Sequence, residues 1–414
     1  MGLFRSALLG LFAIAAAVIA PAVIHMVQVH GIFLTPKQTV LGEGQGPIYI
    51  PDTIHCEDLH HYRPANLLFT ACEDVKTTRF KWFPGLGHLD AESAGQGSIH
   101  VVDPKTFTSD RLAFKNFNGA FITHGIDVIA DPDQDDAVYI FAVNHLPNPK
   151  YAQNTIPDTP AARSQIELFH HVLGSKTARH VRSIRHALIQ TPNDIAALSP
   201  YSFYVTNDHF YRTGFLRLLE DVWPAAKWTN IIHIQLHQLQ HTDPTGGLEA
   251  TIAHSGLWNN NGLGHARTDS ELVVSSAMGG ELYLATRNLE NTSIAVHTTI
   301  PIGTLTDNPS YFVDPYNSDT DDASGFVVAG ISRAVTMPRT ASDPDAMDPV
   351  QVWYARLGSD GWERKLLFED DGSRIRTASA AVLVPVEPVG GVKRAWLFVT
   401  GFLSESMIAV EVDL

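Results

Sequence analysis

The chain has 414 residues and a formal net charge of −15, from 29 Lys and Arg against 44 Asp and Glu. It contains no basic tract, and this composition disfavours nucleic acid as a partner because phosphate binding needs a concentrated basic surface. A chain of this length can bury more than about two-thirds of its unfolded surface, which allows a large core.

The N-terminus has the composition of a targeting segment. After Arg5, residues 6–24 carry no charge and are rich in Leu, Ile, Ala and Phe, which is about the length that spans a bilayer. Small residues before Pro21 are typical of a signal cleavage site, whereas Pro21 and the apolar residues after it favour a retained anchor. A buried core helix is the third interpretation. We expect residues 1–30 to be a signal sequence or membrane anchor that delivers residues 31–414 to the secretory pathway, either extracellular or membrane-anchored.

The chain contains two cysteines, Cys56 and Cys72. In an oxidising compartment they can form a disulfide, and two free buried thiols are the alternative. The triplet that begins at Asn291 is a glycosylation sequon, which agrees with secretion, although such triplets also arise by chance.

Beyond residue 40, short β-branched and aromatic segments recur between Gly, Pro, Asp and Asn residues, a pattern typical of strands joined by tight turns. They occupy residues 65–72, 97–103, 136–144, 201–208, 229–236, 280–288, 292–300, 325–331, 350–357 and 394–402. No helical half accompanies them, so they favour an all-β propeller or a large sandwich over a doubly wound sheet.

Two stretches break this rhythm. Residues 146–165 are polar and rich in Pro, and we interpret them as a loop, either a lid over a site or a surface insertion. In residues 213–228, apolar side chains from Phe215 to Trp223 recur at mostly helical spacing. That helix can pack on the core or contact a membrane surface.

Pairs of adjacent oxygen-donor residues stand far apart in the chain. Glu57-Asp58 and Asn193-Asp194 are two such pairs, and neighbouring side chains on a strand point in opposite directions. Each pair can therefore offer one ligand to each of two ions. Asn261 and the pair Asp307-Asn308 add further carboxylate and amide oxygens, the ligands that calcium prefers.

Two histidines stand out among 20. His124 is followed directly by Gly125, which suits a tight turn that presents the imidazole. His145 ends a predicted strand, where its side chain can point into the central opening of a propeller. Each alone fits a structural role, but beside hard-metal ligands they form a candidate proton-transfer pair.

Several short motifs occur in an order that resembles the serum paraoxonase/arylesterase family. They are CEDL at 56–59, HGI at 124–126, VNH at 143–145, NDI at 193–195, TNDH at 206–209, NG at 261–262 and DN at 307–308. The resemblance covers most of the chain after residue 40, and it depends on the ordered combination because each motif alone is short.

The resemblance implies a six-bladed β-propeller with an N-terminal hydrophobic helix, small helices over the active-site face, and two calcium ions in its central tunnel. The implied ligands of the catalytic calcium are Glu57, Asn193, Asn261, Asp307 and Asn308. Those of the structural calcium are Asp58, Asp194 and the backbone carbonyl of Ile126. His124 would face the catalytic ion, with His145 behind it, as the pair that activates water.

The implied activity is hydrolysis of lactones and aryl esters, with organophosphate triesters as further substrates. The chain lacks a G-x-S-x-G motif, so an acyl-enzyme on serine is not expected. A propeller that only binds, and a propeller of the gluconolactonase or strictosidine-synthase kind, are the alternatives. A partner in the membrane or a lipid surface is expected to be contacted through the N-terminal segment and residues 213–228.

Three features depart from the family pattern. The last residues contain no Cys, so Cys72 is the only available partner for Cys56 and ring closure must come from strand pairing. A second Cys-Glu-Asp, at 72–74, competes with residues 56–58 as the metal pair, and we favour 57–58 because of the sequence that follows it. The insertion after His145 is longer than the family pattern implies.

Overall fold

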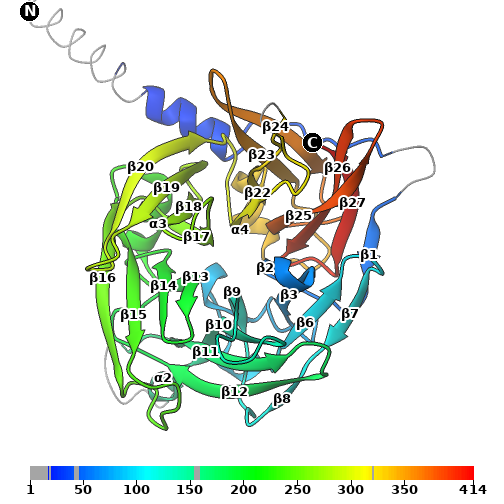
Figure 1. Cartoon of the computed structure of the whole chain (residues 1–414). Helices are drawn as coiled ribbons and strands as arrows, with labels where there is room; N and C mark the ends of the chain where they lie inside the picture. The colour runs from blue at the N-terminus through cyan, green and yellow to red at the C-terminus, as the bar shows by residue number, and fades with distance from the viewer. Residues whose placement is uncertain (1–16, 18–19, 42–45, 153–158, 319–320) are drawn as a thin grey trace, which may run out of the picture.

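Six β-sheets surround a central axis in the computed structural model of the protein (Figure 1). The structure describes residues 17, 20–41, 46–152, 159–318 and 321–414. The six-bladed propeller predicted from the sequence is confirmed, and the sandwich alternative is wrong. Each of the ten segments predicted as strands contains one.

Each blade is an antiparallel sheet of at least four strands. From the axis outward, the blades are β2 (Leu59–Tyr62), β3 (Leu67–Cys72), β6 (Ser98–Asp103), β7 (Thr108–Arg111); β9 (Thr123–Ala130), β10 (Ala137–Pro147), β11 (Ala162–Val172), β12 (Thr177–Ile184); β13 (Pro192–Ser199), β14 (Ser202–Asn207), β15 (Thr229–Leu236), β16 (Leu248–Leu257); β17 (Asn260–His265), β18 (Glu271–Ser276), β19 (Glu281–Arg287), β20 (Ile294–Pro301); β21 (Pro309–Phe312), β22 (Gly325–Ile331), β23 (Val350–Gly358), β24 (Gly361–Asp370); and β25 (Ala378–Val389), β26 (Val392–Gly401), β27 (Met407–Asp413), β1 (Ile48–Ile50).

The remaining elements are short. The strand β8 (Ala113–Lys115) pairs in parallel with the outer strand β12 of the second blade. The others are β4 (Trp82–Phe83), β5 (His88–Leu89), α2 (Pro149–Ala152), α3 (Phe215–Val222), α4 (Met337–Thr340), and the 3-10 turns η1 (Arg63–Ala65), η2 (Pro84–Leu86), η3 (Ala91–Ser93) and η4 (Ala334–Thr336).

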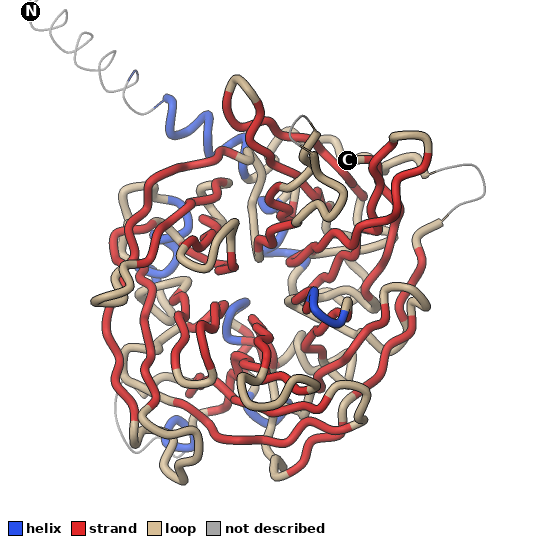
Figure 2. Tube along the Cα trace, viewed as in Figure 1, coloured by secondary structure: helices blue, strands red, loops and turns tan. Residues whose placement is uncertain are grey.

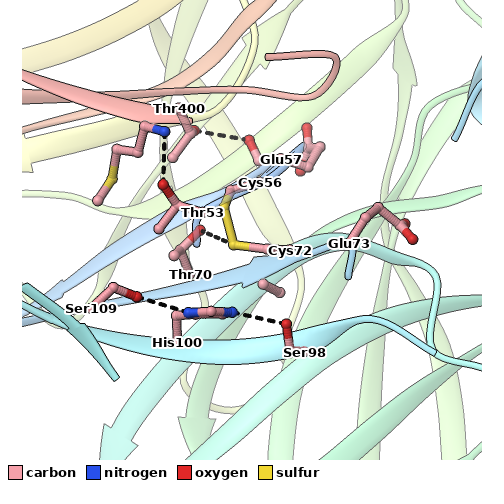
Figure 3. Close-up of a disulfide and its surroundings, with 12 residues drawn as sticks. Thr53, Cys56, Glu57, Thr70, Cys72, Glu73, Ser98, His100, Ser109 and Thr400 are labelled. Atoms are coloured by element: carbon pink, nitrogen blue, oxygen red, sulfur yellow. Dashed lines mark hydrogen bonds between the residues drawn. A yellow bond between two sulfur atoms is a disulfide. The ribbon is translucent and has the colours of Figure 1, made fainter. Parts of the chain in front are cut away.

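The ring closes by strand pairing, as the sequence requires. The N-terminal strand β1 pairs antiparallel with the C-terminal strand β27, with Ile48 opposite Ala409 and Ile50 opposite Met407. Because β1 completes the last blade, backbone hydrogen bonds between the two ends of the chain hold the ring shut. The Cys56–Cys72 disulfide instead lies within the first blade, and the predicted bridge is confirmed (Figure 3).

The apolar core lies between neighbouring blades. In one cluster, Val327 and Val352 of the fifth blade pack against Leu383 and Leu397 of the sixth. The middle strands are accordingly buried on both faces, as in β22, whose seven residues are all buried. The innermost strands are shorter and more polar, and each contacts the innermost strands of the blades beside it (Figure 2). Their inward side chains therefore meet along the axis.

A helix over residues 20–29 precedes the propeller. Its last residue, Val29, packs in a cluster with Leu305 and Phe402, whereas Val23 and Ile24 are exposed. Over the described part of the chain, no helix is long and apolar enough to cross a membrane. The signal or anchor predicted for residues 1–30 lies largely outside the described residues.

Candidate active site

The five residues predicted to bind the catalytic calcium come together at the axis. Glu57 precedes β2, Asn193 and Asn261 are on β13 and β17, and Asp307 and Asn308 lead into β21. The Asn308 amide donates to Glu57 Oε1 at 3.0 Å, and this oxygen lies 3.7 Å from His124 Nε2. Four blades thus contribute to one buried cluster.

Each of these five side chains has a buried oxygen without a hydrogen-bond partner. The atoms are Glu57 Oε2, Asn193 Oδ1, Asn261 Oδ1, Asp307 Oδ1 and Asn308 Oδ1. A buried polar atom that is left unpaired costs about 1 to 3 kcal/mol, so native structures rarely gather several at one place. The oxygens would be satisfied by a cation that prefers oxygen ligands, and the donor set fits calcium.

The second predicted set lies next to the first. The backbone N–H of Ile126 donates to Asp58 Oδ2 at 2.8 Å, and that of Leu263 donates to Asp194 Oδ2 at 2.7 Å. Burial raises the pKa of Asp58 to about 6, and burial together with the charge of Asp58 raises the pKa of Asp194. Two buried carboxylates facing each other need positive charge to stay ionised.

Negative charge accumulates along the axis. Burial, followed by the charge of Asp307, raises the pKa of Glu57, and burial followed by the charge of Asp58 raises the pKa of Asp307. With Asp58 and Asp194, four buried carboxylates share this region. The nearby cation, Arg79, is 3.2 Å from Glu73 and forms its ion pair there.

Within the part of the chain that is described, no group of three or more His, Cys, Asp and Glu side chains is arranged to hold a metal ion. The set at the axis differs from such a group because three of its five side-chain donors are asparagine amides. The calcium sites predicted from the sequence therefore remain predictions.

The two predicted histidines are in contact. His124 Nδ1 lies 2.9 Å from His145 Nε2, and His145 Nδ1 lies 2.7 Å from Ser164 Oγ. The Asn193 amide nitrogen is 3.1 Å from His124 Nε2. Since an amide nitrogen only donates, this contact assigns the lone pair to His124 Nε2 and the proton to Nδ1. Burial lowers the pKa of His145 to about 4, and burial followed by His145 lowers that of His124, so both rings are neutral near pH 7.

The sequence analysis missed the residues that hold this pair. The Phe83 ring packs edge-on against His124 and His145, with centroids 5.1 Å and 5.9 Å apart, and Trp82 Nε1 donates to the His145 carbonyl at 2.7 Å. Ser164, from β11, is the third. The signal available in the sequence was the run Trp82-Phe83 beside Pro84, which is too short to distinguish from ordinary core.

The interpretation of Gly125 as part of a tight turn is wrong. Residues 123–130 form the continuous strand β9. A Cβ atom on Gly125 would lie 2.3 Å from Asp194 Oδ1 and 2.6 Å from the Asn193 carbonyl oxygen. Glycine is required because β9 and β13 approach each other closely at the axis.

A pocket of about 450 Å³ opens onto the histidine pair. Its lining includes His124, His145, Asp208, Leu89 of β5, and Arg217 of α3. The insertion after His145 contributes Tyr151 of α2 and residues 159–162, so the part of it that is described is folded and forms a wall of the pocket. The predicted helix in residues 213–228 is confirmed as α3, but Phe215, Leu218 and Val222 are exposed, which contradicts core packing.

The fold and the axial cluster define a six-bladed propeller with an acidic, oxygen-rich tunnel and a histidine pair at its mouth. Residues 75–320 match the family model of arylesterase, and the chain belongs to the arylesterase family. The match includes the two histidines and begins after Glu57 and Asp58.

Relatives of known name are the serum paraoxonase/arylesterase 2 proteins of Gallus gallus and Homo sapiens, each 26% identical over 57% of this chain and 59% of the relative. Serum paraoxonase/arylesterase 1 of Mus musculus is 26% identical over the same shares. The chain thus spans less than two-thirds of the length of these relatives.

Proposed function

We propose that the protein is a calcium-dependent hydrolase of lactones and aryl esters, with organophosphate triesters as further substrates. The observation that carries this proposal is the set of five buried, unpartnered oxygens beside the His124–His145 pair. Membership of the arylesterase family supports the reaction class. No other arrangement among the described residues places a base next to a candidate electrophilic centre at the end of a pocket.

The ligand roles follow the sequence. Glu57, Asn193, Asn261, Asp307 and Asn308 would hold the catalytic ion, and Asp58, Asp194 and the backbone of Ile126 would hold the structural ion. When bound, calcium supplies the positive charge that stabilises an oxyanion on a carbonyl or phosphoryl group. Two divalent ions would also balance the four buried carboxylates.

The histidines would handle the proton. His124 Nε2, the unprotonated nitrogen, accepts a proton from the attacking water. The charge that develops on this ring is shared through Nδ1 with His145, and Ser164 Oγ accepts from His145 and holds it in place. Phe83 and Trp82 fix both rings, so little reorganisation accompanies proton transfer.

Chelation tests the proposal. Phenyl acetate and a δ-lactone should be hydrolysed in calcium, and treatment with EGTA should lower the rate by about 100-fold or more because the oxyanion loses several kcal/mol of stabilisation. Calcium should restore the rate and magnesium should not. Full activity after complete removal of calcium, checked by elemental analysis, would refute the mechanism.

The variant His124→Gln separates this function from a propeller that only binds. We expect it to lose hydrolysis while it retains calcium-dependent thermal stabilisation. A wild-type protein that binds calcium but hydrolyses no ester or lactone would support the binding module. Activity confined to sugar lactones would support the gluconolactonase kind.

We also propose that the molecule contacts a lipid surface on the secretory side. The exposed fractions of Phe215, Leu218 and Ile24 are 75%, 63% and 65%. His30, at the end of the N-terminal helix, lies near Asp221 of α3, whose charge partly offsets the lowering of the His30 pKa by burial. The two apolar faces are therefore neighbours. Asn291, the predicted glycosylation site, is in an exposed turn elsewhere.

Flotation with phosphatidylcholine vesicles tests this contact. The double variant Phe215→Ser/Leu218→Ser should bind vesicles less than the wild type because it buries less apolar surface in the lipid. Leu289→Ser is a matched control, since Leu289 is 72% exposed but far from α3 in the sequence and on another blade. Equal vesicle binding by all three proteins would contradict the proposal.

A further inference from the structure

Two arginines line the pocket above the histidine pair. Arg217 is on α3, and Arg212 is in the segment that leads into this helix. Arg217 Nη2 donates to the Gly85 carbonyl at 3.1 Å, on the opposite wall, and Arg212 Nε donates to the Gln190 carbonyl at 3.2 Å. Both guanidinium groups are thus held at the pocket by carbonyl oxygens.

Neither arginine forms an ion pair with a carboxylate among the described residues. Arginines elsewhere do: Arg79, Arg111 and Arg376 each contact a carboxylate group. Unpaired arginines are unexpected in a chain with a net charge of −15, where carboxylates outnumber basic groups. Their positive charge is therefore directed at the pocket and is not consumed by structural contacts.

The carboxylate among the described pocket-lining residues does not cancel this charge. It belongs to Asp208, which lies 3.1 Å from His209 Nδ1, and His209 Nε2 is 2.8 Å from Asp221. The pocket has apolar walls as well, from Pro84, Leu89 and Phe210. A ligand that fits has an apolar body that reaches the histidines and an anionic group that reaches the arginines.

We propose that the substrates are esters or lactones that carry an anionic group, a carboxylate or a phosphate or sulfate, at a distance from the bond that is hydrolysed. This inference rests on the proposed hydrolase function and names its substrate class. The planar guanidinium offers paired N–H donors that match the oxygens of such groups. Arg212 is exposed and meets the anion first, while half-buried Arg217 holds it inside the pocket.

Paired substrates test the proposal. Monophenyl glutarate and its neutral methyl ester share the scissile bond and differ in one charge. We expect the wild type to show a higher kcat/KM for the anion, by about tenfold or more, the value of one charge-assisted hydrogen bond. The preference should shrink as ionic strength increases because the arginines are partly exposed.

The variant Arg212→Gln/Arg217→Gln should lose this preference. The readout is the ratio of the two kcat/KM values, which does not depend on the amount of folded enzyme. Arg217→Lys should keep part of the preference, and Arg179→Gln, which removes an exposed arginine on the outer strand β12, should keep all of it. A wild-type ratio of one or below, or an unchanged ratio in the double variant, would overturn the proposal.

Binding of the non-hydrolysable monoanilide of glutarate, measured by calorimetry against its methyl ester, separates the two proposals. If no ester is hydrolysed but the anionic anilide binds more tightly in an Arg-dependent way, the anion site stands and the hydrolase function fails. If neutral esters are hydrolysed and neither anion is preferred, the anion site fails and the hydrolase function stands.

Discussion

The chain contains the tripeptide Cys-Glu-Asp twice, at 56–58 and 72–74, and a disulfide joins the two copies (Figure 3). Glu57 and Glu73 are each 1% exposed. Glu73 is paired with Arg79, and Asp74 with Arg111. The first copy has no arginine in contact, and one oxygen of Glu57 has no partner.

The comparison shows what a buried carboxylate requires. Burial raises the pKa of both glutamates, and the charge of Arg79 lowers that of Glu73, which is left at about 7. At Glu57 the neighbouring charges of Asp307 and Asp58 are negative and raise the pKa further. The same three residues are therefore a structural ion pair in one place and a candidate ion site in the other.

The largest effect is expected from Glu57→Gln, which removes the charge of the unpaired glutamate. Ester hydrolysis in calcium should decrease by about 1,000-fold, or about 4 kcal/mol, because the site loses half of the carboxylate charge that would hold the catalytic ion. Stability in EGTA should not decrease, since a buried uncompensated charge is removed. Activity assays and thermal melts check both, and Asp307→Asn should behave in the same way.

Glu73→Gln should have the opposite profile. It leaves the Arg79 guanidinium buried without its carboxylate, so we expect the free energy of unfolding to decrease by about 3 to 4 kcal/mol. Residual activity per folded molecule should stay much higher than in Glu57→Gln. Urea denaturation combined with active-site titration measures the two quantities. If Glu73→Gln lost calcium binding and kept its stability, the assignment of the two copies would be reversed.

Asp58→Asn tests the deeper pair. In calcium at about 100 times its dissociation constant, the wild type should gain roughly 2.7 kcal/mol of stability from the bound ion. The variant should lose most of this gain because Asp58 faces Asp194 at the implied structural site. Asp74→Asn is the matched control and should change stability by less than about 1 kcal/mol, since its ion pair with Arg111 is partly exposed. Equal calcium-dependent melting shifts in both would argue against a structural ion.

Asp208 extends the comparison to a carboxylate whose partner titrates. Burial lowers the pKa of His209, but the charge of Asp208 and hydrogen bonds from His209 to Asp208 and Asp221 more than offset this and raise it to about 9. The folded pKa lies above the unfolded value of about 6.5. The stabilisation is thus complete below pH 6.5 and is lost as the pH rises to about 9, by roughly 2 kcal/mol. His209→Gln should flatten this part of the stability profile.

How much could be predicted from the sequence differs between the two kinds of strand. The middle strands were predictable because they are β-branched and aromatic and are bounded by turn residues, as in β15 and β22. The innermost strands were not, because β17 (Asn260–His265) is short, polar and rich in glycine and asparagine. Those strands carry the site, and their residues were found as donor pairs and through a family resemblance.

By itself, the sequence determined the all-β class, the acidic character, the possible disulfide and the residue types that could bind an ion. The tertiary structure decided which residues meet. Glu57 and Asn308 are in contact although 251 residues separate them, and Glu73 differs from Glu57 only because Arg79 folds back onto it. The physical reason is that the desolvation and pairing of a charge depend on neighbours that only the closed ring brings together.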